Sequence, residues 1–95
     1  MYERTPLYLA TRSGHLEMIK TLINKGAEDV DIVDEDERTP LHLAARDGRL
    51  GMVKTLINRG ACVNRVDKDE RTPLRLVVED DHTRLIPHLF LKPGV

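Results

Sequence analysis

The chain contains the five-residue sequence ERTPL three times, at Glu3–Leu7, Glu37–Leu41 and Glu70–Leu74. Thr5 and Thr39 are 34 positions apart, Thr39 and Thr72 are 33 apart, and most of residues 3–27 recur unchanged in residues 37–61. A period of this length is typical of proteins that stack one small structural unit. The sequence therefore predicts a repeat protein rather than a compact enzyme.

In the middle copy, the pair Thr39-Pro40 has the features of a helix start. Thr39 offers a hydroxyl acceptor for an N-cap, and Pro40 has the fixed φ that suits the first helical position. Residues 41–47 are long enough for two turns, and Gly48 can take the left-handed conformation that ends a helix. We therefore expect a short first helix in each copy.

A second helix is predicted by apolar residues at helical spacing, namely Leu50, Val53, Leu56 and Ile57. Gly60 is expected to end it, and the polar stretch 61–71 predicts a turn or hairpin before the next Thr-Pro pair. We call this connection the second finger and its counterpart, residues 27–38, the first finger. Helices this short are marginal alone, so the copies must stack, and Ala44 and Ala45 would allow close approach.

The run from Thr39 to Ala45, followed by Gly48, Leu56-Ile57 and residues 60–64, resembles an ankyrin repeat. The resemblance implies an all-α solenoid of stacked helix-turn-helix units with short hairpin or loop fingers. It also implies that His42 forms a structural hydrogen bond near the capping threonine. It covers one domain, residues 1–95, as three copies: Tyr2–Val33, Asp34–Val66 and a degenerate, cap-like Asp67–Val95.

Glutamate stands two residues before the threonine of each copy, where ankyrin repeats usually have glycine, at Glu3, Glu37 and Glu70. If the backbone there still has a positive φ, a non-glycine residue is strained by about 1 kcal/mol or more. The alternative is a finger with a different turn. The first finger is also one residue longer, through Glu28-Asp29.

The third copy departs furthest from the pattern. Val77 and Val78 replace the paired alanines, Asp81 replaces the turn glycine, and Pro87 falls within the expected second helix. Proline inside a helix costs about 3 kcal/mol, so we expect a kink or a late start there. A charged outer stripe would fit a terminal cap, and its residues are Arg84, His88 and Lys92.

Composition disfavours several classes of function. With 15 basic and 16 acidic residues the net charge is −1, so nothing draws the chain to nucleic acid or to a membrane surface. Glu3 and Arg4 interrupt any signal peptide, and no apolar run reaches the roughly 18 residues that span a bilayer. The single cysteine, Cys62, fits a free loop thiol in a reducing compartment, so we expect a cytoplasmic or nuclear protein.

Catalytic and metal sites are not predicted by any spacing in the chain. The 4 histidines lie in different copies or lack metal-ligand spacing. The acidic run from Glu28 to Glu37 lacks the placed glycine and terminal glutamate of a calcium loop. Because Ser13 and Cys62 have no histidine placed to activate them, we expect no enzymatic activity, no cofactor and no metal.

A binding surface is the remaining functional prediction. The resemblance implies that partners contact the finger tips and the exposed ends of the first helices, which line a concave face. The corresponding positions here are Tyr2, Arg4, Arg12, Ser13, Glu35, Asp36, Arg38, Arg46, Asp47, Lys68, Asp69, Arg71, Glu79 and Asp80.

Arginines recur in register within this set, as Arg4, Arg38 and Arg71 and again as Arg12 and Arg46. Spaced by about 8–10 Å, the distance between packed helices, they would suit an acidic peptide or loop of a partner protein. The alternative is that they pair with their own neighbours Glu37, Asp47 and Glu70.

The leading functional hypothesis is a non-catalytic, monomeric module that binds another protein through its concave face. The alternative is a structural or assembly element that oligomerises through its terminal repeats. A third interpretation, an engineered ankyrin binding scaffold, is weakened by the irregular first finger and by Pro87, because designers idealise repeats.

Overall fold

The computed structural model describes residues 6–26 and 30–90, and this part of the chain contains helices and turns but no strand. Its α-helices are α1 (Pro6–Ser13), α2 (Leu16–Asn24), α3 (Pro40–Arg46), α4 (Leu50–Asn58), α5 (Pro73–Glu79) and α6 (Ile86–Phe90). A single 3-10 turn, Thr83–Leu85, leads into α6. The predicted all-α fold, with two short helices in each copy, is confirmed.

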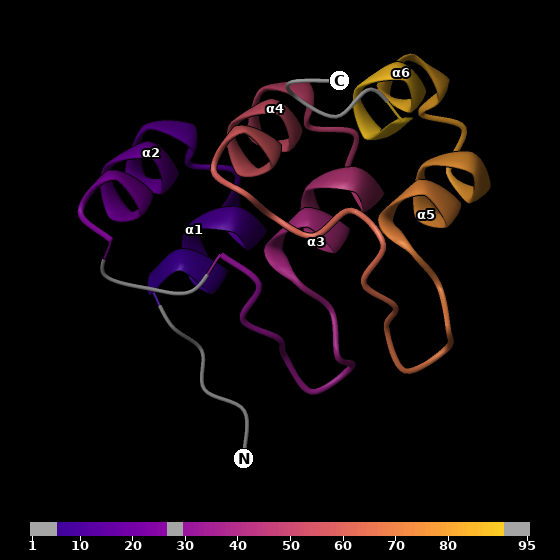
Figure 1. The fold of residues 1–95 in the computed structure, drawn as a ribbon, viewed down its shortest axis with the longest axis horizontal. Coiled ribbons are helices and arrows are strands. Elements are labelled where there is room, and N and C mark those ends of the chain that lie inside the picture. The colour runs from indigo at the N-terminus through magenta and orange to yellow at the C-terminus, as the bar shows by residue number, and fades with distance from the viewer. Residues whose placement is uncertain (1–5, 27–29, 91–95) are drawn as a thin grey trace.

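The helices form two parallel rows. The helix pairs lie side by side, with α1, α3 and α5 in one row and α2, α4 and α6 in the other (Figure 1). Helix α3 packs against both α1 and α5, and each first helix also packs against the second helix of its own pair. The fingers extend away from the row of first helices, so they lie next to one another along one side of the stack (Figure 1).

An aliphatic core lies between the two rows. Every pair contributes completely buried side chains, among them Leu7, Ile19, Leu41, Val53, Val77 and Leu85. Ala44 and Ala45 are also 0% exposed, where α3 lies between its two neighbours. Because each buried aliphatic side chain stabilises the fold by about 1.5–3 kcal/mol, this packing holds helices that are too short to form alone.

The helix ends follow the predicted signals. The Thr39 hydroxyl accepts a hydrogen bond from the backbone N–H of His42 at 3.3 Å, and Pro40 occupies the first helical position of α3. Thr72 caps α5 in the same way. Gly48, in the turn after α3, has a φ of 68° and confirms the left-handed helix end.

The third repeat keeps the plan with two adjustments. Asp81, in place of the turn glycine, keeps the left-handed conformation with a φ of 60°. Helix α6 begins only at Ile86, so Pro87 lies in its first turn, where an intrahelical N–H donor is not needed. The expected late start of this helix is therefore confirmed. Of the predicted cap residues, Arg84 is exposed, His88 is half-buried, and Lys92 lies outside the described residues.

Candidate protein-binding surface

Each finger has a tight turn at its tip that is organised by one aspartate. Asp34 Oδ1 accepts hydrogen bonds from the backbone N–H groups of Asp36 and Arg38, at 2.9 and 3.0 Å. Asp67 Oδ1 accepts from the two equivalent N–H groups of the second finger, both at 2.9 Å. The finger tips are thus shaped by side-chain-to-backbone hydrogen bonds, with no strand assigned in their described residues.

The glutamates that replace glycine keep the left-handed backbone. Glu37 has a φ of 59° and Glu70 a φ of 62°. The N–H of each donates to the carbonyl oxygen of the organising aspartate, Asp34 or Asp67, at 3.0 Å. Strain of about 1 kcal/mol or more is therefore expected at both positions. Glu3 and the extra residue at Glu28-Asp29 lie outside the described residues.

Neighbouring fingers are joined directly to each other. The backbone N–H of Lys68 donates to the carbonyl oxygen of Asp36 at 2.9 Å, and Lys68 Nζ lies 3.6 Å from Asp36 Oδ1. Arg38 Nε donates to Asp67 Oδ2 at 3.3 Å. These bonds fix the position of one finger tip relative to the next.

The Asp67 carboxylate is ionised although its side chain is only 1% exposed. Burial alone would raise the pKa of Asp67. Hydrogen bonds from the backbone N–H groups of Arg71 and Asp69, together with the Arg38 guanidinium, outweigh that effect and lower the pKa below its ordinary value of 3.8. Asp67 is therefore a buried anionic anchor for both fingers.

The second finger is also held by the helix behind it. His42, which is 0% exposed, accepts a hydrogen bond at Nδ1 from the Thr39 backbone N–H, at 3.1 Å. Its Nε2–H therefore donates to the carbonyl oxygen of Arg71, at 2.8 Å. Burial lowers the pKa of His42 below 6.5, although the Arg71 carbonyl partly opposes this. The structural role implied for His42 is confirmed.

In α1, Tyr8 occupies the position equivalent to His42 and makes a similar link. Its hydroxyl donates to Asp34 Oδ2 at 3.1 Å, across 26 positions of the sequence. Two of the three first helices therefore send a side chain into the following finger. These links connect the positions of the fingers to the packing of the helices.

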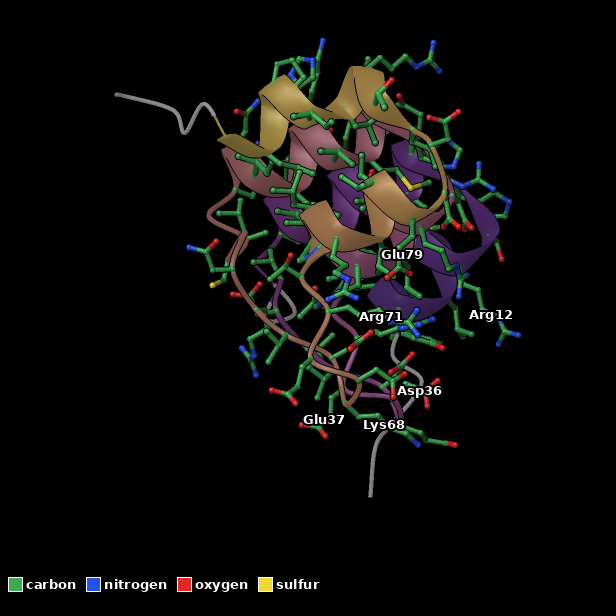
Figure 2. All side chains as sticks on the ribbon, turned by 90° about the vertical axis from the view of Figure 1, so that its right-hand side faces the viewer. Arg12, Asp36, Glu37, Lys68, Arg71 and Glu79 are labelled. Atoms are coloured by element: carbon green, nitrogen blue, oxygen red, sulfur yellow. The ribbon has the colours of Figure 1, made fainter. Side chains whose placement is uncertain are left out.

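The predicted contact residues that the structure describes lie at the finger tips and at the C-terminal ends of the first helices. Figure 2 shows Arg71 and Glu79 next to each other below α5, Asp36 and Lys68 together at the finger tips, and Arg12 at the level of Arg71 on the right. Tyr2 and Arg4 lie outside the described residues. We call the described set the finger surface; its members are Arg12, Ser13, Glu35, Asp36, Arg38, Arg46, Asp47, Lys68, Asp69, Arg71, Glu79 and Asp80.

The arginines of this surface differ in how strongly the chain itself engages them. The Arg38 side chain is 16% exposed and pairs with Asp67, not with the adjacent Glu37 that the alternative interpretation named. Arg46 Nε lies 3.2 Å from Oδ1 of its neighbour Asp47, as expected, and this pair is much more exposed. Arg38 is thus a structural residue, whereas Arg46 is accessible.

In the third repeat Arg71 is held by ion pairs within the chain, whereas Arg12 in the first repeat is accessible. Arg71 Nη1 lies 3.2 Å from Glu79 Oε1 and Nη2 lies 3.9 Å from Asp69 Oδ2, so the alternative in which Arg71 pairs with Glu70 is wrong. Arg12 is exposed, and no ion pair joins it to another residue of the described chain. The accessible guanidinium groups are therefore fewer than the sequence register suggested.

The organising aspartates were not among the predicted functional residues. The signal for them is present, because the pattern D-x-D-E-R-T-P begins at Asp34 and again at Asp67. Aspartate at the start of a turn commonly accepts hydrogen bonds from backbone groups that follow it. Their recurrence in register could have identified them as the residues that shape the fingers.

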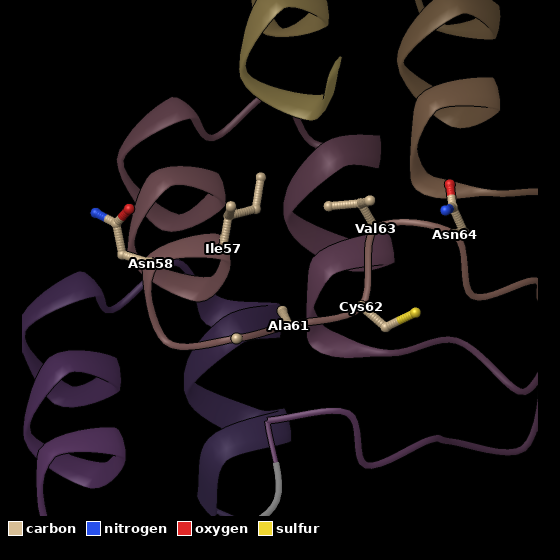
Figure 3. Close-up of a pocket in the computed structure, with 7 residues that line it drawn as sticks. Ile57, Asn58, Ala61, Cys62, Val63 and Asn64 are labelled. Atoms are coloured by element: carbon tan, nitrogen blue, oxygen red, sulfur yellow. The ribbon is translucent and has the colours of Figure 1, made fainter. Parts of the chain in front are cut away.

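A separate open pocket of about 420 Å³ lies where α4 leads into the second finger, and Ile57, Ala61 and Val63 contribute to its lining. Figure 3 shows the side chains of Ile57 and Val63 directed into the same space, with the Cys62 side chain turned away. Cys62 is an exposed, free thiol, and its backbone N–H donates to Asp31 Oδ1 at 3.0 Å.

Among the described residues, no group of three or more histidine, cysteine or acidic side chains is arranged to hold a metal ion.

Stacked pairs of short helices with fingers along one side define a helical repeat protein. The family model for ankyrin repeats, in three copies, matches residues 2–67 and 28–94. The chain therefore belongs to the ankyrin repeat family, whose members generally bind other proteins and are generally non-catalytic. A comparison with curated protein sequences finds no match. In the part of the chain that the structure describes, no helix is long and apolar enough to span a membrane.

Proposed function

We propose that this chain is a non-catalytic module that binds a partner protein through the finger surface. The observation that carries the proposal is the direct bonding between fingers, from Lys68 to Asp36 and from Arg38 to Asp67. Binding is weakened by the entropy lost when loops become ordered. Fingers that are already fixed to one another avoid much of that loss, so they suit recognition.

An acidic peptide or loop of the partner is the ligand that this surface fits best. Arg12 has no ion pair with another described residue, and the Arg46 and Asp47 side chains are 37% and 28% exposed. Exposed pairs of this kind contribute about 0–1 kcal/mol, so a carboxylate of the partner can replace the internal one. Arg12 and Arg46 occupy the same position in neighbouring repeats, so they present two guanidinium groups in register.

Affinity capture from a cell lysate tests this proposal. The wild-type chain is compared with Arg12→Glu/Arg46→Glu, and Lys54→Glu on the exposed face of α4 serves as a matched charge reversal away from the fingers. We expect the partner to be retained by the wild type and by the control, and its binding to weaken by about tenfold or more in the double variant. Binding should also weaken as salt rises, because exposed charges are screened beyond about 8 Å at physiological ionic strength.

Arg38 is not a suitable test residue, because its reversal would place a negative charge beside the buried Asp67 carboxylate. Circular dichroism must show that each variant is folded before binding is compared. If the double variant retains the same proteins as the wild type, with the same salt dependence, the finger surface is not where the partner binds.

A further inference from the structure

The N-terminal end of the stack exposes apolar side chains at positions that are buried in later repeats. Leu9 in α1 is 45% exposed, whereas Leu43 and Leu76, at the same position of the second and third repeats, are each 2% exposed. Met18 in α2 is 52% exposed, whereas its counterpart Met52 is 2% exposed. Within the described residues, the second and third repeats have another repeat packed on this side, and the first does not. We call Leu9 and Met18 the N-terminal face.

The C-terminal end shows the converse pattern. Val78 in α5 is 58% exposed, although its counterparts Thr11 and Ala45 are 0% exposed. Leu74 is half-buried, whereas its counterpart Leu41 is fully buried. We call Leu74 and Val78 the C-terminal face. It contains an open pocket of about 310 Å³ lined by Thr72, Leu74, Arg75, Val78 and Glu79. Figure 2 views the molecule from this end, with α5 and α6 in front.

The two faces resemble the two sides of the contact between first helices of adjacent repeats. Helix α1 packs against α3, and its residues Leu7 and Thr11 are fully buried. In α5 the same two positions hold Leu74 and Val78, and valine has the shape of threonine. On the N-terminal face, α1 carries Leu9 at the position where α3 has Leu43. The C-terminal face therefore offers α1 of another copy nearly the surface that α1 offers α3.

Covering the C-terminal face leaves its charged groups paired. Arg75 Nε lies 3.1 Å from Glu79 Oε2, and Arg71 Nη1 lies 3.2 Å from Glu79 Oε1. The side chains that border Val78 thus satisfy one another before any contact forms. This matters because burying an unpaired charge would cost more than the apolar contact returns.

We infer that copies of this chain stack head to tail, with α1 of one copy packed on α5 of the next. The contact continues the packing of α1 on α3 and of α3 on α5 within the chain. The contact joins the N-terminal face of one copy to the C-terminal face of another. Each added copy therefore leaves one face of each kind free at the ends, and assembly does not stop at a dimer. The contact adjoins the finger surface at Glu79 but does not include Arg12 or Arg46, the arginines proposed to bind the partner.

Analytical ultracentrifugation of the full chain over a range of concentrations tests this inference. The wild type should show an average mass that rises with concentration above the monomer mass of 10.8 kDa. Leu9→Glu should disable the N-terminal face and Val78→Glu the C-terminal face, so each variant alone should remain a monomer. Both side chains are exposed in the free chain, so the variants should keep the wild-type circular dichroism spectrum.

Mixing the two variants distinguishes head-to-tail stacking from other contacts. Leu9→Glu keeps an intact C-terminal face and Val78→Glu keeps an intact N-terminal face, so an equimolar mixture should form dimers of twice the monomer mass and nothing larger. Lys54→Glu, on the exposed face of α4, should assemble like the wild type. A wild type that stays monomeric overturns the inference. So does a single variant that still dimerises, which would indicate a symmetric contact, or a mixture that does not associate.

Discussion

Arg38 and Asp67 join neighbouring fingers across 29 positions of the sequence, with Arg38 Nε donating to Asp67 Oδ2 at 3.3 Å. The other oxygen of the same carboxylate accepts two backbone N–H groups of its own finger. One side chain therefore shapes the second finger and holds the first. Because Asp67 is 3% exposed, water cannot readily take the place of its carboxylate as the acceptor for these three donors.

Replacing Asp67 with alanine should lower the free energy of unfolding by about 2–4 kcal/mol, because three donors lose their acceptor at once. Arg38→Ala should cost less, about 1–2 kcal/mol, since the two N–H groups still satisfy the carboxylate. Urea unfolding measures both. Arg46→Ala, at an exposed ion pair, is the control and should change stability by less than about 0.5 kcal/mol. Equal costs for Asp67→Ala and Arg46→Ala would show that Asp67 is not an anchor.

Acidification should weaken the fold in two stages. The folded-state pKa of His42 is below its ordinary value of 6.5, so below that pH the unfolded chain binds more protons and stability falls. The pKa of Asp67 is below 3.8, so its contribution is present above that pH and is lost as the pH falls through the folded-state pKa. His42→Gln should be less stable at neutral pH but should lose less on acidification below pH 6.5. Urea unfolding at a series of pH values measures this, and an unchanged slope in the variant would exclude His42 as its source.

Substituting glycine for Glu37 or Glu70 should stabilise the chain by about 1 kcal/mol each, because glycine accepts the positive φ without steric strain. Glu35→Gly, in the same finger but not at a positive φ, is the matched control and should be neutral or destabilising. Thermal unfolding followed by circular dichroism compares the three variants. A stabilisation that is equal at Glu35 would point to the loss of negative charge rather than to the relief of strain.

The helices could be predicted from the sequence because their signals are local. Thr39, Pro40 and Gly48 act on the residues next to them, and α3 begins and ends accordingly. The partner of Arg38 could not be predicted in this way. Glu37 is adjacent in sequence, but the ion pair of Arg38 is with Asp67 of the next finger. The stacking of the repeats instead brings Asp67 of the second finger next to the Arg38 guanidinium. The sequence of a single repeat does not show how close these two groups lie.

Pro87 should be almost neutral for stability despite lying in a helix. It occupies the first turn of α6, where its missing N–H leaves no intrahelical hydrogen bond unmade. Pro87→Ala should therefore change the free energy of unfolding by less than about 0.5 kcal/mol. Lys54→Pro, in the interior of α4, is the contrasting control and should cost about 3 kcal/mol or more. A large gain on replacing Pro87 would mean that the ring distorts α6.

The position of α3 between α1 and α5 has a consequence for how the chain folds. Among the first helices, α3 is the main packing partner of both α1 and α5. The main contacts therefore join helices of the same repeat or of adjacent repeats, and proteins rich in local contacts fold quickly. The middle repeat is the natural nucleus, because it alone gains contacts on both sides as its neighbours condense. In the native state, amide hydrogen exchange should accordingly be slowest in α3 and α4 and should quicken toward both ends, as the outer repeats open first.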